Sequence, residues 1–129
     1  MHTTNYFDTF IAIADDCPAK TGEAPPTKEL QSAVQIQYAL LAGHPYEHTS
    51  DEVLYRSNGE RRGQSREEFF SKGQPCFRSS PLTKRYGWGV HSNAEGRIAI
   101  YAVGSDEYCQ LAADTSLKQL KGMRSTRAG

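Results

Sequence analysis

The chain has 129 residues, 37% of them hydrophobic, and its 15 basic and 15 acidic residues leave a formal net charge of zero. This length indicates one domain spanning residues 1–129, and the balanced charge does not indicate a nucleic-acid partner. No apolar run reaches the roughly 18–20 residues of a membrane span, and the N-terminus lacks the basic and apolar regions of a signal peptide. Three cysteines without a CxxC spacing fit a reducing compartment. We therefore expect a cytoplasmic protein with no membrane partner.

The first third of the chain predicts a strand, a loop and a helix. Residues 5–14 are rich in aromatic and β-branched side chains, and both faces of a strand formed by them would be largely apolar. This pattern predicts an internal strand covered on both sides. Proline and glycine make residues 18–26 a loop. Residues 28–42 carry apolar side chains at three- and four-residue steps, and this spacing predicts a helix. We expect Thr27 to cap the start of this helix, and Gly43 to lie in the left-handed position just beyond its end.

The middle of the chain is polar and its patterns are weaker. Thr49 and Glu52 have the spacing of a capping box at a helix start. Residues 53–55 fit either a helical turn or a short strand. Residues 57–66 are polar and contain two glycines, so we expect a mobile loop.

Two short helices are expected before the C-terminal part of the chain. Residues 66–70 predict the first, which ends near Gly73. Ser80 as N-cap and Pro81 at the first helical position predict the start of the second. Residues 74–78 between them are expected to be extended, because the residue before a proline avoids the helical conformation.

Residues 86–103 are the best-defined unit and predict a β-hairpin. The loop 93–96 ends in a glycine, as a three-residue hairpin loop with a left-handed last residue requires. The register that follows pairs Val90 with Ile100. One face then carries the apolar residues Trp88, Val90, Ile98 and Ile100, and the other carries Gly87, Gly89, His91, Arg97, Ala99 and Tyr101.

The C-terminal part predicts two helices. Ser105, followed by two acidic residues, caps the first. Residues 115–124 predict the second, because their apolar side chains share one helical face: Leu117, Leu120 and Met123. The chain as a whole shows no alternation of strand, helix and strand. We therefore expect an α+β fold with a small antiparallel sheet, including the hairpin at about 86–103, and helices packed on at least one face.

Three segments carry a resemblance to a known family. They are residues 1–10, which read MHTTNYFDTF, residues 70–76, which read FSKGQPC, and residues 80–91, which read SPLTKRYGWGVH. With these segments the chain resembles, over nearly its whole length, a family of small and mostly bacterial proteins called domain of unknown function 6157. The resemblance implies a stand-alone cytoplasmic domain. It implies no activity, cofactor or catalytic residue.

The zero net charge hides an asymmetry along the chain. Residues 1–52 hold eight acidic and two basic residues, a net charge of −6, whereas residues 53–129 hold seven acidic and thirteen basic residues, a net charge of +6. In the simpler interpretation the two parts pack together and neutralise each other. In the other, residues 72–97 form a basic surface that binds a small anionic ligand or an acidic partner, and this is the leading functional hypothesis.

Two positions could hold a ligand, and at the first of them the ligand would be an anion. The first is the predicted helix start, where hydroxyl and cationic side chains surround free backbone N–H groups: Arg78, Ser79, Ser80, Lys84 and Arg85. The second is the polar face of the hairpin, where Gly87 and Gly89 leave space around His91, with Tyr101 on the paired strand. Each position also has a simpler interpretation, namely a capped helix with solvated charges and a helix packed against the two glycines.

Two alternatives belong to other functional classes. A small enzyme would use His91 with the thiol of Cys76, whose pKa Arg78 could lower. A protein-interaction or homo-oligomeric module would use an exposed sheet edge or an exposed apolar face. We expect no metal site, because His44 and His48 are separated by Pro45 and no cluster has the spacing of metal ligands. We also expect no cofactor, since phosphate-loop and dinucleotide motifs are absent.

Overall fold

A five-stranded sheet forms the centre of the molecule in a computed structural model that describes residues 2–28 and 30–125. The strands are β1 (Thr9–Ala12), β2 (His48–Thr49), β3 (Trp88–Ser92), β4 (Arg97–Ala102) and β5 (Lys118–Lys121). They lie in the order β2-β4-β3-β1-β5, and of the pairings between them β1 with β5 is parallel while the others are antiparallel. The prediction of an α+β fold with a mainly antiparallel sheet is confirmed.

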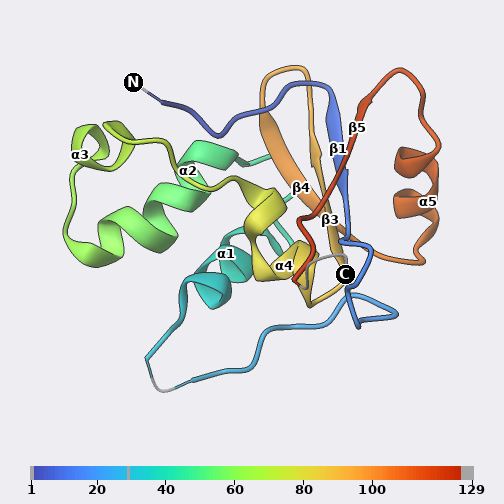
Figure 1. Cartoon of the computed structure of the whole chain (residues 1–129), viewed down its shortest axis with the longest axis horizontal. Helices are drawn as coiled ribbons and strands as arrows, with labels where there is room; N and C mark the ends of the chain where they lie inside the picture. Colours follow the sequence, from blue (N-terminus) through green and yellow to red (C-terminus); the bar gives the residue numbers. More distant parts are fainter. Residues whose placement is uncertain (1, 29, 126–129) are drawn as a thin grey trace.

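Helices cover both faces of this sheet. The α-helices are α1 (Ala33–Leu41), α2 (Ser50–Leu54), α3 (Arg66–Phe70), α4 (Pro81–Lys84) and α5 (Asp106–Ala112). Between them lie a π-helix, Tyr55–Gly59, and two 3-10 turns, Glu60–Arg62 and Phe77–Ser79. Figure 1 shows α1, α2 and α3 on one side of the sheet and α5 on the other. In the described part of the chain, no helix has the length and apolar character needed to cross a membrane.

The main core lies between the sheet and a layer formed by α1, α2, α4 and the 3-10 turn Phe77–Ser79. Strand residues Ile11, Val90 and Ile98 pack there with buried side chains of the helical layer: Leu41, Val53, Leu54, Phe77 and Leu82. A second, smaller cluster joins the π-helix to α3 through the rings of Tyr55, Phe69 and Phe70. Since both clusters include residues of the segment 50–82, this segment is anchored at its two ends.

The predicted hairpin is confirmed. Val90 pairs with Ile100 as expected, and Gly96 ends the loop with a φ of 79°. Val90 and Ile98 are buried in the main core, whereas Trp88 and Ile100 are half-buried against it. The caps predicted at Ser80, with Pro81 at the first helical position, and at Ser105 are also present.

The first strand and helix are shorter than predicted. β1 spans four residues instead of ten, although it is internal, with β3 on one side and β5 on the other. Helix α1 begins at Ala33 instead of residue 28, because Ser32 and Gln35 form a complete capping box and so satisfy the first backbone N–H groups. Leu30, which the helical pattern placed on the buried face, is 84% exposed. The predicted left-handed glycine at the helix end is confirmed, with a φ of 76° at Gly43.

The polar segment 57–66 is helical for most of its length, so the prediction of a mobile loop is wrong. Residues 55–59 form the π-helix, and the N–H of Glu60 donates to the carbonyl of Tyr55. Gly59 is buried, and a Cβ atom there would lie 2.8 Å from both the Phe69 and Tyr55 rings. The segment 57–66 is polar and by its composition would lie in solvent. Its packing against the rings of Tyr55 and Phe69 keeps it folded onto the rest of the protein.

The start of α2 corrects a smaller detail. Thr49 caps this helix as predicted, and residues 53–55 are helical. The carboxylate of Glu52, however, does not bond back to Thr49. It pairs with Arg66 at 2.6 Å, so the capping box is incomplete.

The predicted helix at 115–124 is wrong, because residues 118–121 form strand β5. This strand runs parallel to β1 and pairs Thr9 with Lys118 through Ala12 with Lys121. The apolar residues whose spacing predicts a helix do not form one buried face. Leu120 packs against the core, whereas Met123 is 51% exposed. The free edge of β1 offers backbone hydrogen bonds along the whole segment, and this tertiary pairing overrides the local pattern.

Candidate functional site

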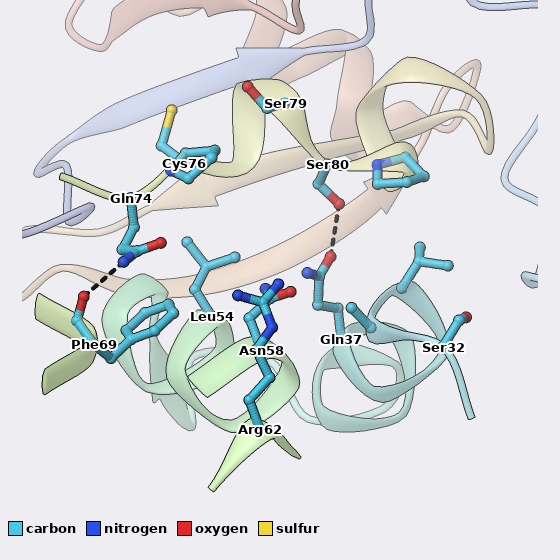
Figure 2. A pocket seen from close by; sticks show the side chains of 14 residues that line it. Ser32, Gln37, Leu54, Asn58, Arg62, Phe69, Gln74, Cys76, Ser79 and Ser80 are labelled. Atoms are coloured by element: carbon cyan, nitrogen blue, oxygen red, sulfur yellow. Dashed lines mark hydrogen bonds between the residues drawn. The ribbon is translucent and has the colours of Figure 1, made fainter. Parts of the chain in front are cut away.

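A pocket of about 430 Å³ lies between α1, the helical segment 54–62 and the chain that leads into α4. Figure 2 shows it from close by, with the segment 74–81 above and the helices below. Its lining combines apolar side chains with amides, hydroxyls, one thiol and one guanidinium. The lining residues are Ser32, Ala33, Val34, Gln37, Leu54, Asn58, Arg62, Phe69, Gln74, Pro75, Cys76, Ser79, Ser80 and Pro81.

Three local features of the sequence position these walls. The capping box of Ser32 and Gln35 places the first turn of α1 at the pocket. The π-helix widens one turn of the segment 54–62, a feature that is frequent at functional sites. Ser80 and Pro81 start α4 and turn the chain above the pocket.

A chain of buried polar side chains forms the wall between α1 and α4. The Ser80 hydroxyl donates to Gln37 Oε1 at 2.7 Å, and Gln37 Nε2 donates to Ser57 Oγ at 3.3 Å. Asn58 Nδ2 also donates to Ser57 Oγ, at 3.3 Å. Gln37, Ser57 and Ser80 are each at least nine-tenths buried. Because these buried groups satisfy one another's hydrogen bonds, the wall is rigid. The side-chain amide of Asn58 lines the pocket and supplies the polar groups of this wall that a ligand can reach.

Arg62 is the one charged side chain among the described residues that line the pocket. It extends from the 3-10 turn toward Asn58, as Figure 2 shows. Within residues 2–28 and 30–125 its guanidinium has neither an ion-pair partner nor a hydrogen-bond partner. Five N–H donors with a permanent positive charge are therefore available at the pocket.

Cys76 lies on the opposite wall with its thiol 3.6 Å from the Tyr6 hydroxyl. This hydrogen bond, together with burial, raises the pKa of Tyr6. The thiol is half-buried and unpaired with any other cysteine. It therefore lines the pocket as a weakly polar group.

The structure does not bring the predicted anion-binding residues together. Arg78 Nε donates to the carbonyl of Lys121 at 2.7 Å, and the Ser79 hydroxyl lies 3.0 Å from the Met123 sulfur. Ser79 and Ser80 line the pocket with Cys76, whereas Arg78, Lys84 and Arg85 do not. Helix α4 has only four residues, and its cap is turned inward.

The polar face of the hairpin has no open space beside its glycines. A Cβ atom at Gly89 would lie 2.6 Å from the Phe10 ring and 2.7 Å from the Tyr108 ring, which belongs to α5. At Gly87 it would lie 2.2 Å from the carbonyl oxygen of Thr21. The chain itself fills this space, and at Gly89 it is a helix that packs against the glycine, as the simpler interpretation has it. The alternative of a ligand beside the two glycines is not supported.

His91 and Tyr101 meet in a separate hydrogen-bonded cluster on this face. The Tyr46 hydroxyl lies 2.7 Å from His91 Nδ1 and 2.9 Å from the Tyr101 hydroxyl. Burial lowers the pKa of His91, with Asp8 and Asp114 opposing that shift, and burial together with the Tyr101 hydrogen bond raises the pKa of Tyr46.

The structure separates His91 from Cys76. Val90, the neighbour of His91, packs in the same core as Phe77, the neighbour of Cys76. Side chains alternate along a strand, so the imidazole points away from that core and from the thiol.

Gln37, Asn58 and Arg62 are pocket residues that the sequence does not single out. Gln37 falls on the apolar face of a helix that the sequence predicts, and a glutamine in that position is a recognisable signal. Asn58 and Arg62 carry no signal, because the polar segment that holds them predicts a mobile loop. Elsewhere in the described residues, no group of three or more His, Cys, Asp or Glu side chains is placed to hold a metal ion.

Comparison with known proteins identifies a family. The pattern of a family described as a family of unknown function (DUF6157) matches residues 1–128. No curated protein and no solved structure matches the chain. Because the match covers nearly every residue, including the walls of the pocket, the chain belongs to the DUF6157 family.

Proposed function

We propose that this protein binds a small organic anion in the pocket between α1, the segment 54–62 and the segment 74–81. The observation that carries the proposal is the unpaired guanidinium of Arg62 at a pocket whose other described lining residues are uncharged. The proposal keeps the leading hypothesis of an anionic ligand. It moves the site from the basic segment 72–97 to a pocket that shares only the residues from Gln74 to Pro81 with it.

The size and lining of the pocket support this function. Binding sites for small molecules usually enclose roughly 300–1,000 Å³ and combine apolar walls with a few polar groups. The pocket encloses about 430 Å³, with Leu54, Phe69 and Val34 among its apolar residues and Asn58 and Arg62 among its polar ones. The wall behind them is fixed by the bonds of Gln37, so little ordering is needed when a ligand binds.

Electrostatics favour a negative charge in the ligand. No acidic residue is among the described residues that line the pocket, so nothing there competes for the Arg62 guanidinium. The first residues of α1 also line the pocket, and this helix has no acidic residue in its first turn. The N-terminal end of a helix carries a partial positive charge, which adds to that of the guanidinium.

Binding can be measured by amide chemical shifts and thermal unfolding with benzoate, octanoate and phenyl phosphate as probes. At least one probe should shift the amides of residues 32–37 and 58–62 in a saturable way. At about a hundred times its dissociation constant it should add roughly 2.7 kcal/mol to the free energy of unfolding. Arg62→Gln should lose both effects.

Arg61→Gln is the matched control, because Arg61 is exposed in the same 3-10 turn and does not line the pocket. It removes the same charge and should bind as the wild type does. The proposal would be refuted if none of the probes saturates, if Arg62→Gln binds as well as Arg61→Gln, or if the shifts gather around Arg78 and Arg85 instead.

We also propose a cytoplasmic location. The three free cysteines support it, since unpaired thiols persist in reducing compartments.

A further inference from the structure

We infer that the anion held in the pocket is a monocarboxylate with an apolar body, and not a phosphate ester. The inference rests on the proposed function and specifies its ligand class. It draws on three properties of the pocket: the number of its charges, the kind of donors it offers and the character of its remaining surface.

The charge of the pocket matches one negative charge. Phosphate monoesters carry about −1.5 to −2 at neutral pH, and they are usually bound by several cationic or backbone donors. Arg62 is the single cation among the described lining residues. The cations of the nearby segment lie elsewhere, with Arg78 bonded to the backbone of β5 and Lys84 and Arg85 outside the pocket. One carboxylate is therefore compensated here, whereas a phosphate dianion is not.

The serine hydroxyls that could bind a phosphate already make hydrogen bonds within the protein. The Ser80 proton is donated to Gln37, and the Ser80 oxygen accepts from the N–H of Leu82. The Ser79 hydroxyl is directed to the Met123 sulfur. What remains is the planar guanidinium of Arg62 with the amide of Asn58 beside it, and a planar fork of two N–H groups fits the two oxygens of a carboxylate.

The rest of the pocket suits an apolar body. Leu54, Phe69, Pro75 and Pro81 line it together with the first residues of α1. The pocket has a volume of about 430 Å³. An eight-carbon acid fits within this volume, and its chain displaces water from the apolar side chains.

Isothermal titration calorimetry with three probes of equal chain length tests the inference: octanoate, octyl phosphate and 1-octanol. The full chain should bind octanoate at least tenfold more tightly than either of the other two, a difference of about 1.4 kcal/mol. Arg62→Gln should weaken octanoate binding at least tenfold and leave 1-octanol binding unchanged. Arg61→Gln should leave all three unchanged.

The possible failures are distinguishable. If octyl phosphate binds as tightly as octanoate or more tightly, and Arg62→Gln abolishes its binding, the carboxylate inference is wrong and the proposed function stands. If 1-octanol binds as tightly as octanoate in both Arg62→Gln and the wild type, the pocket is apolar without anion recognition, and both are wrong. Ala33→Leu, which fills the pocket from α1 without changing charge, should weaken octanoate binding, and unchanged binding would place the ligand elsewhere and overturn the inference.

Discussion

Tyr46 shows how one side chain can constrain a face of the sheet. Its backbone lies in the left-handed region, with a φ of 60°, which costs about 1–3 kcal/mol in a residue other than glycine. Its hydroxyl lies within hydrogen-bond distance of both His91 Nδ1 and the Tyr101 hydroxyl. These contacts hold Tyr46 in place and offset the backbone cost.

The neutral state of His91 predicts a pH dependence of stability. Burial lowers the pKa of His91 in the folded protein, so the unfolded chain, with a histidine pKa of about 6.5, takes up a proton first as the pH falls. The contribution of His91 is therefore fully present above about pH 6.5 and is lost as the pH falls toward the lower, folded pKa. Urea unfolding at pH 7.5 and 5.5 should show that His91→Gln loses less stability on acidification than the wild type does.

His2→Gln is the control for this experiment, because His2 is exposed and its substitution should leave the pH dependence as in the wild type. An equal loss of stability in His91→Gln and the wild type would show that the imidazole is not held neutral by its surroundings.

At the scale of the secondary-structure element, β5 is the clearest case of a segment whose structure depends on its neighbour. The N–H of Lys118 donates to the carbonyl of Asp8, and that of Gly122 donates to the carbonyl of Ala12. Because strand residues alternate, the N–H of Leu120 also faces β1, whereas that of Lys121 faces away. On the outer side, Arg78 bonds the Lys121 carbonyl and so covers part of a free sheet edge.

Proline substitutions distinguish this strand from the helix that the sequence predicts. Leu120→Pro removes an N–H from the ladder with β1 as well as a half-buried side chain, and should destabilise the fold by about 3 kcal/mol or more. Lys121→Pro removes an outward N–H and an exposed ion pair with Asp15, and should cost about 1 kcal/mol or less. Chemical denaturation of both variants measures the difference. Similar losses would contradict the strand, since a helix is broken equally at both positions.

At the scale of the whole molecule, the acidic N-terminal part and the basic C-terminal part are interleaved. Strand β1 lies between β3 and β5, and ion pairs join Glu52 with Arg66 and Asp15 with Lys121. These pairs are partly or largely exposed, so each contributes only about 0–1 kcal/mol. These two ion pairs join the acidic part of the chain to the basic part, as the simpler interpretation of the charge asymmetry expects.

The central position of β1 predicts that the chain unfolds as one unit. Removing residues 1–13 leaves β3 and β5 without their shared neighbour and removes Phe10 and Ile11 from the interior, where both are at most 1% exposed. The shortened chain should show no cooperative thermal transition by far-ultraviolet circular dichroism. Phe7→Ala, a change of a 58% exposed residue in the same segment, should keep the transition. A cooperative transition in the shortened chain would show that the remaining strands form a stable sheet without β1.

Features that depend on neighbouring residues can be predicted from the amino-acid sequence. The hairpin at 88–102 follows from a glycine at the left-handed loop position and a period of two. The caps at Thr49, Ser80 and Ser105 follow from hydroxyls placed before short helical runs. Each feature lies within one short stretch of the chain, and the longest, the hairpin, spans residues 88–102, so local patterns suffice.

Strand β5, the helical form of residues 55–62 and the pocket depend instead on contacts between segments that lie far apart along the chain. β5 exists because β1 offers an edge 106 or more residues away along the chain, and the π-helix docks because Phe69 packs against Gly59. Arg62 lies at the pocket because of this packing. Arg78, the stronger candidate for anion binding in the sequence, instead donates a hydrogen bond to the backbone of β5. Packing between distant segments sets which cation lies at the pocket, and a local sequence pattern carries no information about it.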